Sequence, residues 1–309
     1  MAMSNPDNLG LSGTLSELES QRLAAFKAVS NRLLLTLAAT IAVMALGYLG
    51  GFRAGLILVA VIGGIVALII RSVLLRRVTQ DFKRRVMPVL VRGIDPSLSY
   101  DGGRCIAEGE FNEARLYMRP DRYSGKDLVQ GNIGATAVRF SLVHAEEKYE
   151  ETETDSDGQS HSHTEYRTIF RGLFFIADFN KHFTARTKVE PHGVGFLDKL
   201  FGAHVELENP EFNKLFAVSS TDQVEARYIM TPELMEQFMA LRAKVGNFKT
   251  AFADEHVFMA LEMGWDAFEP SLKVPLTQSD QVDKILSKLR SVTGIVEQLG
   301  LNVRIWSKA

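Results

Sequence analysis

The sequence contains only one cysteine, Cys105, so no disulfide can form within the chain. Small secreted domains that depend on disulfides carry several paired cysteines, and this class of protein is excluded. The cysteine usage therefore gives no indication of an oxidising compartment. We expect Cys105 to be a small apolar residue in or near a core.

Catalytic and cofactor-binding motifs are also missing. The chain has no GxxxxGK[ST] phosphate loop, no GxSxG nucleophile turn, no HExxH zinc motif and no paired CxxC. Residues 193–198, GVGFLD, resemble a dinucleotide-binding turn, but Asp198 stands where the third glycine belongs and would repel a pyrophosphate. We therefore assign no catalytic, cofactor-binding or metal-binding residue. The sequence leaves an enzyme open and favours a protein without catalysis of its own.

The net positive charge of the chain lies in its first third. Residues 1–85 carry ten Lys/Arg and four Asp/Glu, a net charge of +6, whereas the remainder carries 25 Lys/Arg and 33 Asp/Glu, a net charge of −8. An acidic domain repels phosphate unless it hides a local basic patch. Nucleic acid is therefore not expected as a partner of the larger, C-terminal part.

Two long apolar runs lie near the N-terminus, at 33–50 and at 54–73, and Arg71 is the only charged residue in them. A bilayer core of about 30 Å needs about twenty helical residues, so each run is long enough to cross a membrane. Only residues 51–53 separate the runs, which predicts a transmembrane helical hairpin over 33–75. A second apolar run directly after the first argues against a cleaved signal peptide.

Basic residues flank the outer ends of both runs, and the turn between the runs contains only Arg53. By the positive-inside rule both ends of the hairpin face the cytoplasm, so the C-terminal domain is predicted to be cytosolic. The basic cluster after the second run also suits anionic lipid headgroups, at about 1 kcal/mol per residue near the surface. This cluster consists of Arg76, Arg77, Lys83, Arg84 and Arg85.

The segments on either side of the hairpin are predicted to be helical. Residues 1–32 form a cytosolic N-terminal helix, with Thr14 and Glu17 at the spacing of a capping box. Residues 76–93 form a basic juxtamembrane stalk in which Pro88 can introduce a kink. Small residues four apart in the hairpin permit close packing of its helices. They are Gly47, Gly51, Gly55, Ala60 and Gly64.

Residues 94–309 are predicted to form a cytosolic α+β domain with a mixed or antiparallel sheet, because strand and helix patterns alternate without βαβ regularity. The clearest boundaries belong to a helix at 231–246, which has Thr231 as N-cap and Gly246 just past its end. Residues 94–103 read as a loop. Strands are predicted at 127–133, 135–145, 167–179, 182–190 and 301–306, with two short strands in 248–263, and further helices at 196–202 and 279–300.

The stretch YEETETDSDGQSHSHTEY, at 149–166, is the most polar part of the chain. Eight acids and one lysine occur in 144–165, so the stretch cannot bury surface and is predicted to be a solvated hairpin loop. A transition-metal site at His161 and His163, with His144 or Glu165 as third ligand, is an alternative. A calcium loop is a weaker one, because Glu153, Asp155, Asp157 and Gly158 match only the first half of an EF-hand.

Polar residues near the end of the strand at 167–179 form the candidate site of an enzyme. Asp178 and His182 could act as an acid–base pair, although a turn stabilised by local hydrogen bonds explains the same residues. Asp222 and Glu225 could face a ligand, but they also suit the start of a short helix capped by Thr221.

Three stretches resemble one bacterial membrane-protein family: YSGKDLVQGNIG, IFRGLFFIADFNKHF and VELENPEFNKLFAVSSTDQVEARYIMTPELM. The chain is similar over about 15–306 to the family catalogued as domain of unknown function 3137. The resemblance implies two N-terminal spans and a cytosolic α+β domain in a bacterial inner membrane, and it supplies no activity, cofactor or catalytic residue. It also implies gene neighbourhood with LemA-like membrane proteins, which suggests such a protein as a partner.

The leading hypothesis is a membrane-anchored cytosolic interaction or sensing module. The alternatives are a membrane-proximal enzyme with a site near Asp178, His182 and Asp222, and a metal-responsive module that uses His161 and His163. Oligomeric state, ligand and physiological trigger are not encoded in any motif.

Overall fold

The computed structural model describes residues 10–50, 55–154, 160–193 and 202–301. The chain forms two compact units: Met1–Leu90 together with Glu269–Leu286, and Val91–Phe268 together with Ser287–Ala309. The chain therefore leaves the first unit, builds most of the second, returns to the first over Glu269–Leu286, and ends in the second.

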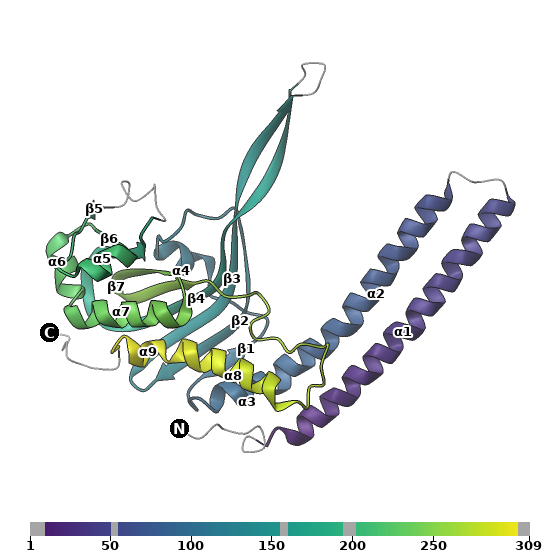
Figure 1. Cartoon of the computed structure of the whole chain (residues 1–309), viewed down its shortest axis with the longest axis horizontal. Coiled ribbons are helices and arrows are strands. Elements are labelled where there is room, and N and C mark those ends of the chain that lie inside the picture. The colour runs from purple at the N-terminus through teal and green to yellow at the C-terminus, as the bar shows by residue number, and fades with distance from the viewer. Residues whose placement is uncertain (1–9, 51–54, 155–159, 194–201, 302–309) are drawn as a thin grey trace. The chain divides into compact units, whose positions relative to one another are not determined.

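The first unit is built on a hairpin of two long helices, α1 (Ser12–Leu49) and α2 (Leu56–Arg85), which pack against each other (Figure 1). At 1.5 Å per residue these helices are about 57 Å and about 45 Å long, so both exceed the thickness of a bilayer core. Their most apolar windows are 0% buried. The two helices are long and apolar enough to cross a membrane, and they are not the buried core helices of a soluble protein.

Among the described glycines, Gly63 has the tightest contact between the two helices. A Cβ atom built on Gly63 would lie 2.4 Å from Oγ1 of Thr40, whereas Cβ atoms on Gly55 or Gly64 would meet nothing within 4 Å. Gly47 also approaches a neighbour, 3.2 Å from Leu56. Small residues thus do permit close packing, but Gly63 is the critical position and Gly64 is not.

The ends of the hairpin differ in detail from the prediction. The helix α1 begins at Ser12 after Leu11, so the predicted capping box at Thr14 and Glu17 is wrong, and α1 continues without a break into the first apolar run. The second helix ends at Arg85, and a short helix α3 (Met87–Arg92) follows. The break falls just before Pro88, whose ring is incompatible with a continuous helix.

The base of the hairpin is closed by the returning segment Glu269–Leu286. Arg22 donates to the carboxylate of Glu19 at 2.7 Å and to the carbonyl oxygen of Leu272 at 3.0 Å. The other oxygen of Glu19 accepts the backbone N–H of Leu276 at 2.8 Å. Nζ of Lys83 lies 2.9 Å from the carboxylate of Glu269. Because Arg22 and Lys83 are both buried, these bonds also satisfy charges that would otherwise be costly.

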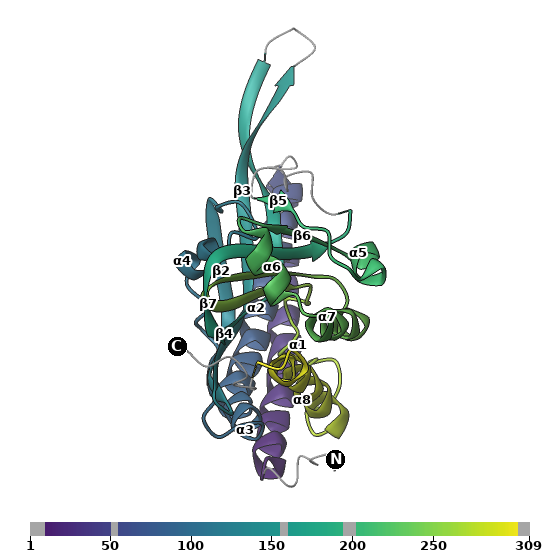
Figure 2. The ribbon, with the colours of Figure 1, turned by 90° about the vertical axis from the view of Figure 1, so that its left-hand side faces the viewer.

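The second unit is an antiparallel sheet in which the described strands follow the order β1-β2-β3-β4-β6-β5, and β7 also pairs with β4 (Figures 1 and 2). The strands are β1 (Ser99–Asp101), β2 (Arg122–Ile133), β3 (Thr136–Thr154), β4 (Ser160–Pro191), β5 (Ala203–His204), β6 (Phe216–Ser220) and β7 (Phe248–Leu261). The helices are α4 (Glu108–Glu113), α5 (Pro210–Leu215), α6 (Gln223–Ile229), α7 (Pro232–Val245), α8 (Ser279–Thr293) and α9 (Ile295–Gln298), with α8 crossing from one unit to the other. The predicted α+β class is confirmed.

Two aromatic clusters stabilise the sheet. On one face Phe111 of α4 packs against Phe174 at 5.0 Å between ring centroids and stacks on Tyr117 at 5.9 Å. In the second cluster Phe238 of α7 contacts Phe216 and Phe248 at 5.9 and 5.6 Å. Fully burying one such side chain is worth about 1.5–3 kcal/mol. These clusters explain why α4 and α7, although short, have fixed places on the domain.

Several predicted elements are confirmed and several are corrected. The helix predicted at 231–246 is α7, with the Thr231 hydroxyl accepting the N–H of Leu234. The strands predicted at 167–179 and 182–190 form one strand, β4, and 248–263 contains one strand rather than two. Register shifts in the β4–β7 pairing accommodate this continuity. The predicted loop at 94–103 contains β1.

The C-terminal region also differs from its prediction. The helix expected over 279–300 is interrupted at Gly294 and forms α8 and α9. The helix predicted at 196–202 lies almost entirely outside the described residues, and so does the strand predicted at 301–306.

Candidate functional site

The strands β3 and β4 continue past the rest of the sheet as a two-stranded ribbon, here called the arm (146–154 and 160–168) (Figures 1 and 2). Cross-strand pairs line one side of it. The carboxylate of Glu147 accepts from Arg167, and the Tyr149 hydroxyl donates to Glu165 at 2.7 Å. The hydrogen bond to Glu165 raises the pKa of the Tyr149 hydroxyl. The arm is therefore a paired ribbon, not the loop that its polarity predicts.

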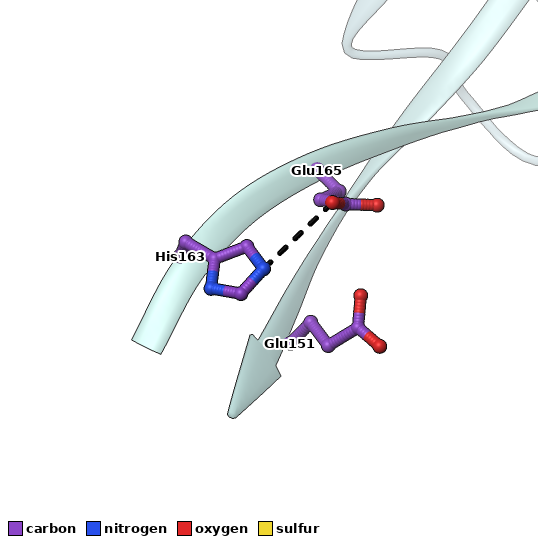
Figure 3. A group of neighbouring side chains, drawn as sticks. All are labelled: Glu151, His163 and Glu165. Atoms are coloured by element: carbon purple, nitrogen blue, oxygen red, sulfur yellow. Dashed lines mark ion pairs between the residues drawn. The ribbon is translucent and has the colours of Figure 1, made fainter. Parts of the chain in front are cut away.

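A possible metal-binding group lies on this ribbon. Glu151 stands opposite His163, and Nε2 of His163 lies 3.7 Å from a carboxylate oxygen of Glu165 (Figure 3). One ligand atom from each of the three residues lies within 4.8 Å of the others. An imidazole and two carboxylates are ligands that Zn²⁺ and Mn²⁺ accept. All three residues are exposed, so the group needs no opening to receive an ion.

The structure brings together only part of the predicted metal site. His163 and Glu165 lie close to each other, as predicted, and Glu151 was missed because it belongs to the opposite strand. His161 pairs with Glu153 in the backbone register, but its side chain lies outside the described residues. His144 is elsewhere: its Nε2 is 2.9 Å from the Thr168 hydroxyl.

The calcium prediction is wrong where the structure describes it. Glu153 lies in β3, and strands flank the stretch where an EF-hand requires helices. Asp155, Asp157 and Gly158 lie outside the described residues.

The residues predicted for an enzyme have separate neighbours. Asp178 stands opposite His256 on β7. His182 is exposed, and its Nδ1 lies 4.0 Å from Glu255. Oδ1 of Asp222 accepts the N–H groups of Val224 and Glu225, so Asp222 is the N-cap of α6. Within the described residues no hydrogen bond or ion pair joins Asp178, His182 and Asp222.

The neighbours of α6 are likewise structural. The carboxylate of Glu225 accepts the backbone N–H groups of Thr184 and Ala185, at 3.1 and 2.6 Å. Thr221 does not cap α6 as predicted, since its hydroxyl accepts the N–H of Arg186. These bonds fix the turn between β6 and α6 against β4, and they occupy the acidic groups that a catalytic site would use.

His256 is a polar residue that sequence reasoning missed. Its Nδ1 is buried without a hydrogen-bond partner among the described residues, and its ring contacts Phe258 at 5.8 Å. Asp178 and His256 are 78 positions apart in the sequence, so only the register of β4 and β7 reveals that they are paired.

Buried groups near α4 are held neutral by their surroundings. Burial, and then the nearby Glu190 and Glu262, raise the pKa of the Tyr117 hydroxyl. Burial raises the pKa of the Cys105 thiol, and Cys105 is half-buried as expected. Neither group is activated as a nucleophile or base at neutral pH.

Residues 168–301 match the family model described as "Protein of unknown function (DUF3137)". The match covers 134 of the 309 residues, from 168 to 301. The match begins inside β4 and ends after α9, so it contains the candidate residues on β4, α6 and β7 and leaves out the hairpin of α1 and α2. The family predicted from the sequence is thus confirmed over 168–301.

The chain was also compared with curated proteins and with solved structures. No curated protein matches the chain. Among solved structures, the chain is similar to the mycobacterial trehalose monomycolate transport factor A, TtfA, with 10% sequence identity, coverage of 62% of this chain and 93% of that chain, and a TM-score of 0.30. A TM-score this low carries no argument about function.

Proposed function

We propose that the protein is a membrane-anchored interaction module, in which the hairpin of α1 and α2 holds a DUF3137 domain at the bacterial inner membrane to bind a protein partner. The observation that carries the proposal is the exposed apolar surface of the hairpin. Leu46, Leu49 and Ile57 are 70%, 82% and 77% exposed. Apolar surface exposed to water costs free energy, whereas the same surface in contact with lipid does not.

The basic flanks support an orientation with both chain ends in the cytoplasm. Arg76 and Arg77 follow the second apolar run, Arg71 lies near its end, and Lys27 and Arg32 precede the first. Within the predicted lipid-binding cluster, Lys83 pairs with Glu269 and Arg85 with Glu17. Arg76, Arg77 and Arg84 are exposed, as Arg85 is, and their charges support contact with anionic headgroups.

Membrane anchoring is tested by placing a charge in an exposed apolar position. We expect Val61→Arg to reduce the membrane-bound fraction, because a central charge costs about 2.5–3.5 kcal/mol on insertion. The control is Val224→Arg, at an apolar position of α6 that is 79% exposed and outside the hairpin. Alkaline extraction of membranes separates bound from free protein. Full-length protein that stays monodisperse without detergent would contradict the anchor, and a periplasmic signal from a reporter after Ala309 would contradict the orientation.

The interaction role is tested by in-membrane cross-linking of the full-length chain, followed by mass spectrometry. We expect one stoichiometric protein partner, and a LemA-like membrane protein is the first candidate. A chain that yields no partner but turns over a metabolite would instead support the enzyme alternative, for which the geometry of Asp178, His182 and Asp222 supplies no assembled site.

A second candidate function is a metal-responsive module. It is favoured by the placement of Glu151, His163 and Glu165, whose ligand atoms lie within 4.8 Å of one another on an exposed ribbon. A bound divalent ion would crosslink β3 to β4 along the arm and stiffen it. The test is Zn²⁺ binding to the full-length chain.

A further inference from the structure

Within the described residues, one edge of β4 has no neighbouring strand along Thr168–Arg171. The strand β7 pairs with β4 up to Leu173, opposite Leu261, and the chain then leaves the sheet. On its other edge β4 remains paired with β3. Backbone groups of an antiparallel strand point alternately to its two sides, so alternate residues of 168–171 direct N–H and C=O groups to the open side. No described residue forms a backbone hydrogen bond to that side.

A hollow of about 590 Å³ lies along this open edge, a volume typical of ligand-binding pockets. One wall is β4, and the other is the chain that departs from β7. The hollow is lined by Tyr117, Thr168, Ile169, Phe170, Arg171, Glu262, Met263 and Gly264. Tyr117 and Ile169 pack against the buried core cluster, and Phe170 belongs to it. Packing against the core therefore holds the apolar lining residues in place in the free chain.

Arg171 supplies a positioned cation at one end of the hollow. Its guanidinium carbon lies 5.3 Å from the centroid of the Trp265 ring, and no described carboxylate forms an ion pair with it. A guanidinium held against an aromatic ring keeps its fork of N–H donors available for a carboxylate. Glu262 lies on the opposite wall and repels an acid there, so the Arg171 end is the place for a negative group.

We propose that this hollow binds an extended peptide segment of a protein partner, which adds as a strand to the open edge of β4. The peptide places an apolar side chain on Phe170 and a carboxylate on Arg171. Because Phe170 and Arg171 are adjacent in a strand, their side chains point to opposite faces, and the two peptide residues must also be neighbours. The inference rests on the proposed interaction function and gives it a surface.

A second copy of the chain fits this edge poorly. Antiparallel pairing of two β4 edges along 168–171 would extend the arm of each copy along the other copy's β4 past Leu173, where β7 already pairs with that edge. A short peptide avoids this overlap and satisfies the open backbone groups.

The probe is a display library of random nine-residue peptides, selected on the full-length chain in phosphatidylcholine nanodiscs. We expect enriched peptides to share an acid next to an apolar residue. Gly264→Leu should weaken their binding at least tenfold by filling the hollow. A Cβ at this position meets only the flexible carboxylate of Asp266, at 3.2 Å, so the fold is kept. The matched control is Gly109→Leu, at an exposed glycine of α4 with nothing within 4 Å of its Cβ position.

The charge is tested with Arg171→Glu, which should also weaken binding at least tenfold. The control is Arg167→Glu on the same strand, where the native side chain pairs with Glu147 and does not line the hollow. Hydrogen exchange should show protection of amides in 168–171 when a peptide binds. Any of four results would overturn the proposal. Peptide binding is unchanged by Gly264→Leu, or the bound peptide protects amides of another segment. Alternatively, the amides of 168–171 are already fully protected in the free chain, or the chain self-associates through this edge.

Different results contradict the peptide site and the proposed function. If wild type and Gly264→Leu capture a membrane partner equally, the interaction function is supported and the peptide site is contradicted. If Gly264→Leu and Arg171→Glu both weaken peptide binding but the chain captures no membrane partner, the peptide site is supported and the proposed function is contradicted.

Discussion

At the residue scale, polar side chains in this protein are mostly used for local structure. Asp222 illustrates this, because both of its contacts are backbone N–H groups at the start of α6. A carboxylate at this position satisfies two donors that the helix itself cannot pair. The same residue type and spacing that suggest chemistry in a sequence thus describe a helix cap in the structure.

We expect Asp222→Ala to destabilise α6 by about 1 kcal/mol, whereas Asp222→Ser, which keeps an acceptor, loses much less. The measurement is hydrogen exchange of α6 amides, which should accelerate about fivefold in the alanine variant. Equal protection in both variants would mean that the cap contributes nothing and would reopen another role for Asp222.

The exposed group on the arm gives a second prediction at this scale. We expect the full-length chain to bind Zn²⁺, and His163→Ala or Glu165→Gln to weaken binding at least tenfold, because each removes one of three ligands. The control is His182→Ala, an exposed histidine outside the group. Calorimetric titration provides the measurement, and an affinity that all three variants share would remove the metal-responsive function.

At the element scale, the hairpin of α1 and α2 depends on one close contact. We expect Gly63→Ala to destabilise the hairpin by about 1–3 kcal/mol, because its Cβ would overlap three atoms of the Thr40 side chain. Gly64→Ala is the matched control, with no atom within 4 Å and a gain in helix propensity of about 1 kcal/mol. Thermal midpoints in detergent should fall for the first and hold or rise for the second.

A Thr40→Ala change should restore part of the loss in Gly63→Ala, because it removes the Oγ1 and Cγ2 atoms that the new Cβ would meet at 2.4 and 3.0 Å. If both glycine variants behaved alike, the close approach at Gly63 would not be what holds the helices together.

The contact between α1 and the returning segment gives a pH dependence. The hydrogen bond from Arg22, helped by the Leu276 N–H, lowers the pKa of the Glu19 carboxyl below its ordinary 4.5. A carboxyl with a lowered pKa stabilises the folded state fully above its unfolded pKa, and the contribution is lost as pH falls through the folded pKa. We expect amides in 271–276 to lose protection below about pH 4.5, when corrected for intrinsic exchange.

The matched variants are Glu19→Gln and Glu17→Gln. The first should remove this pH dependence. The second removes an exposed pair with Arg85 and should change little, because solvent screens exposed ion pairs. A pH response that survives Glu19→Gln would assign it to another group.

Elements defined by local signals could be predicted from the sequence. Thr231, Pro232 and Gly246 mark both ends of α7, and the apolar runs mark α1 and α2. The candidate sites depend on strand register, which local sequence does not contain. Glu151 meets His163, and Asp178 meets His256, only because β3, β4 and β7 align as they do. Where β7 leaves the sheet also decides that Arg171 borders a hollow.

At the scale of the whole molecule, the DUF3137 match is smaller than the folded unit. It starts at 168, within β4, and so omits β1, β2, β3 and α4. The omitted part supplies Phe111 and Val143 to the buried cluster that also contains Phe174. The sheet therefore cannot be completed from the matched residues alone.

We expect a fragment of residues 168–301 to aggregate, because β4 would lose its pairing with β3 and expose the apolar side chains beneath α4. A fragment of 94–301 retains the sheet and should be more soluble, with fast exchange in 269–286, whose partners on α1 and α2 are missing. Solubility and near-ultraviolet circular dichroism compare the fragments. Cooperative unfolding of 168–301 would show that the family boundary is a folding boundary.

The bond from Arg22 to Leu272 spans 250 positions and the bond between Lys83 and Glu269 spans 186. A ribosome adds about 5–20 residues per second, so roughly ten seconds or more pass between the emergence of Lys83 and that of Glu269. During translation Lys83 therefore lacks its Glu269 partner for that time. A nascent chain truncated before Glu269 should be the form most exposed to membrane proteases.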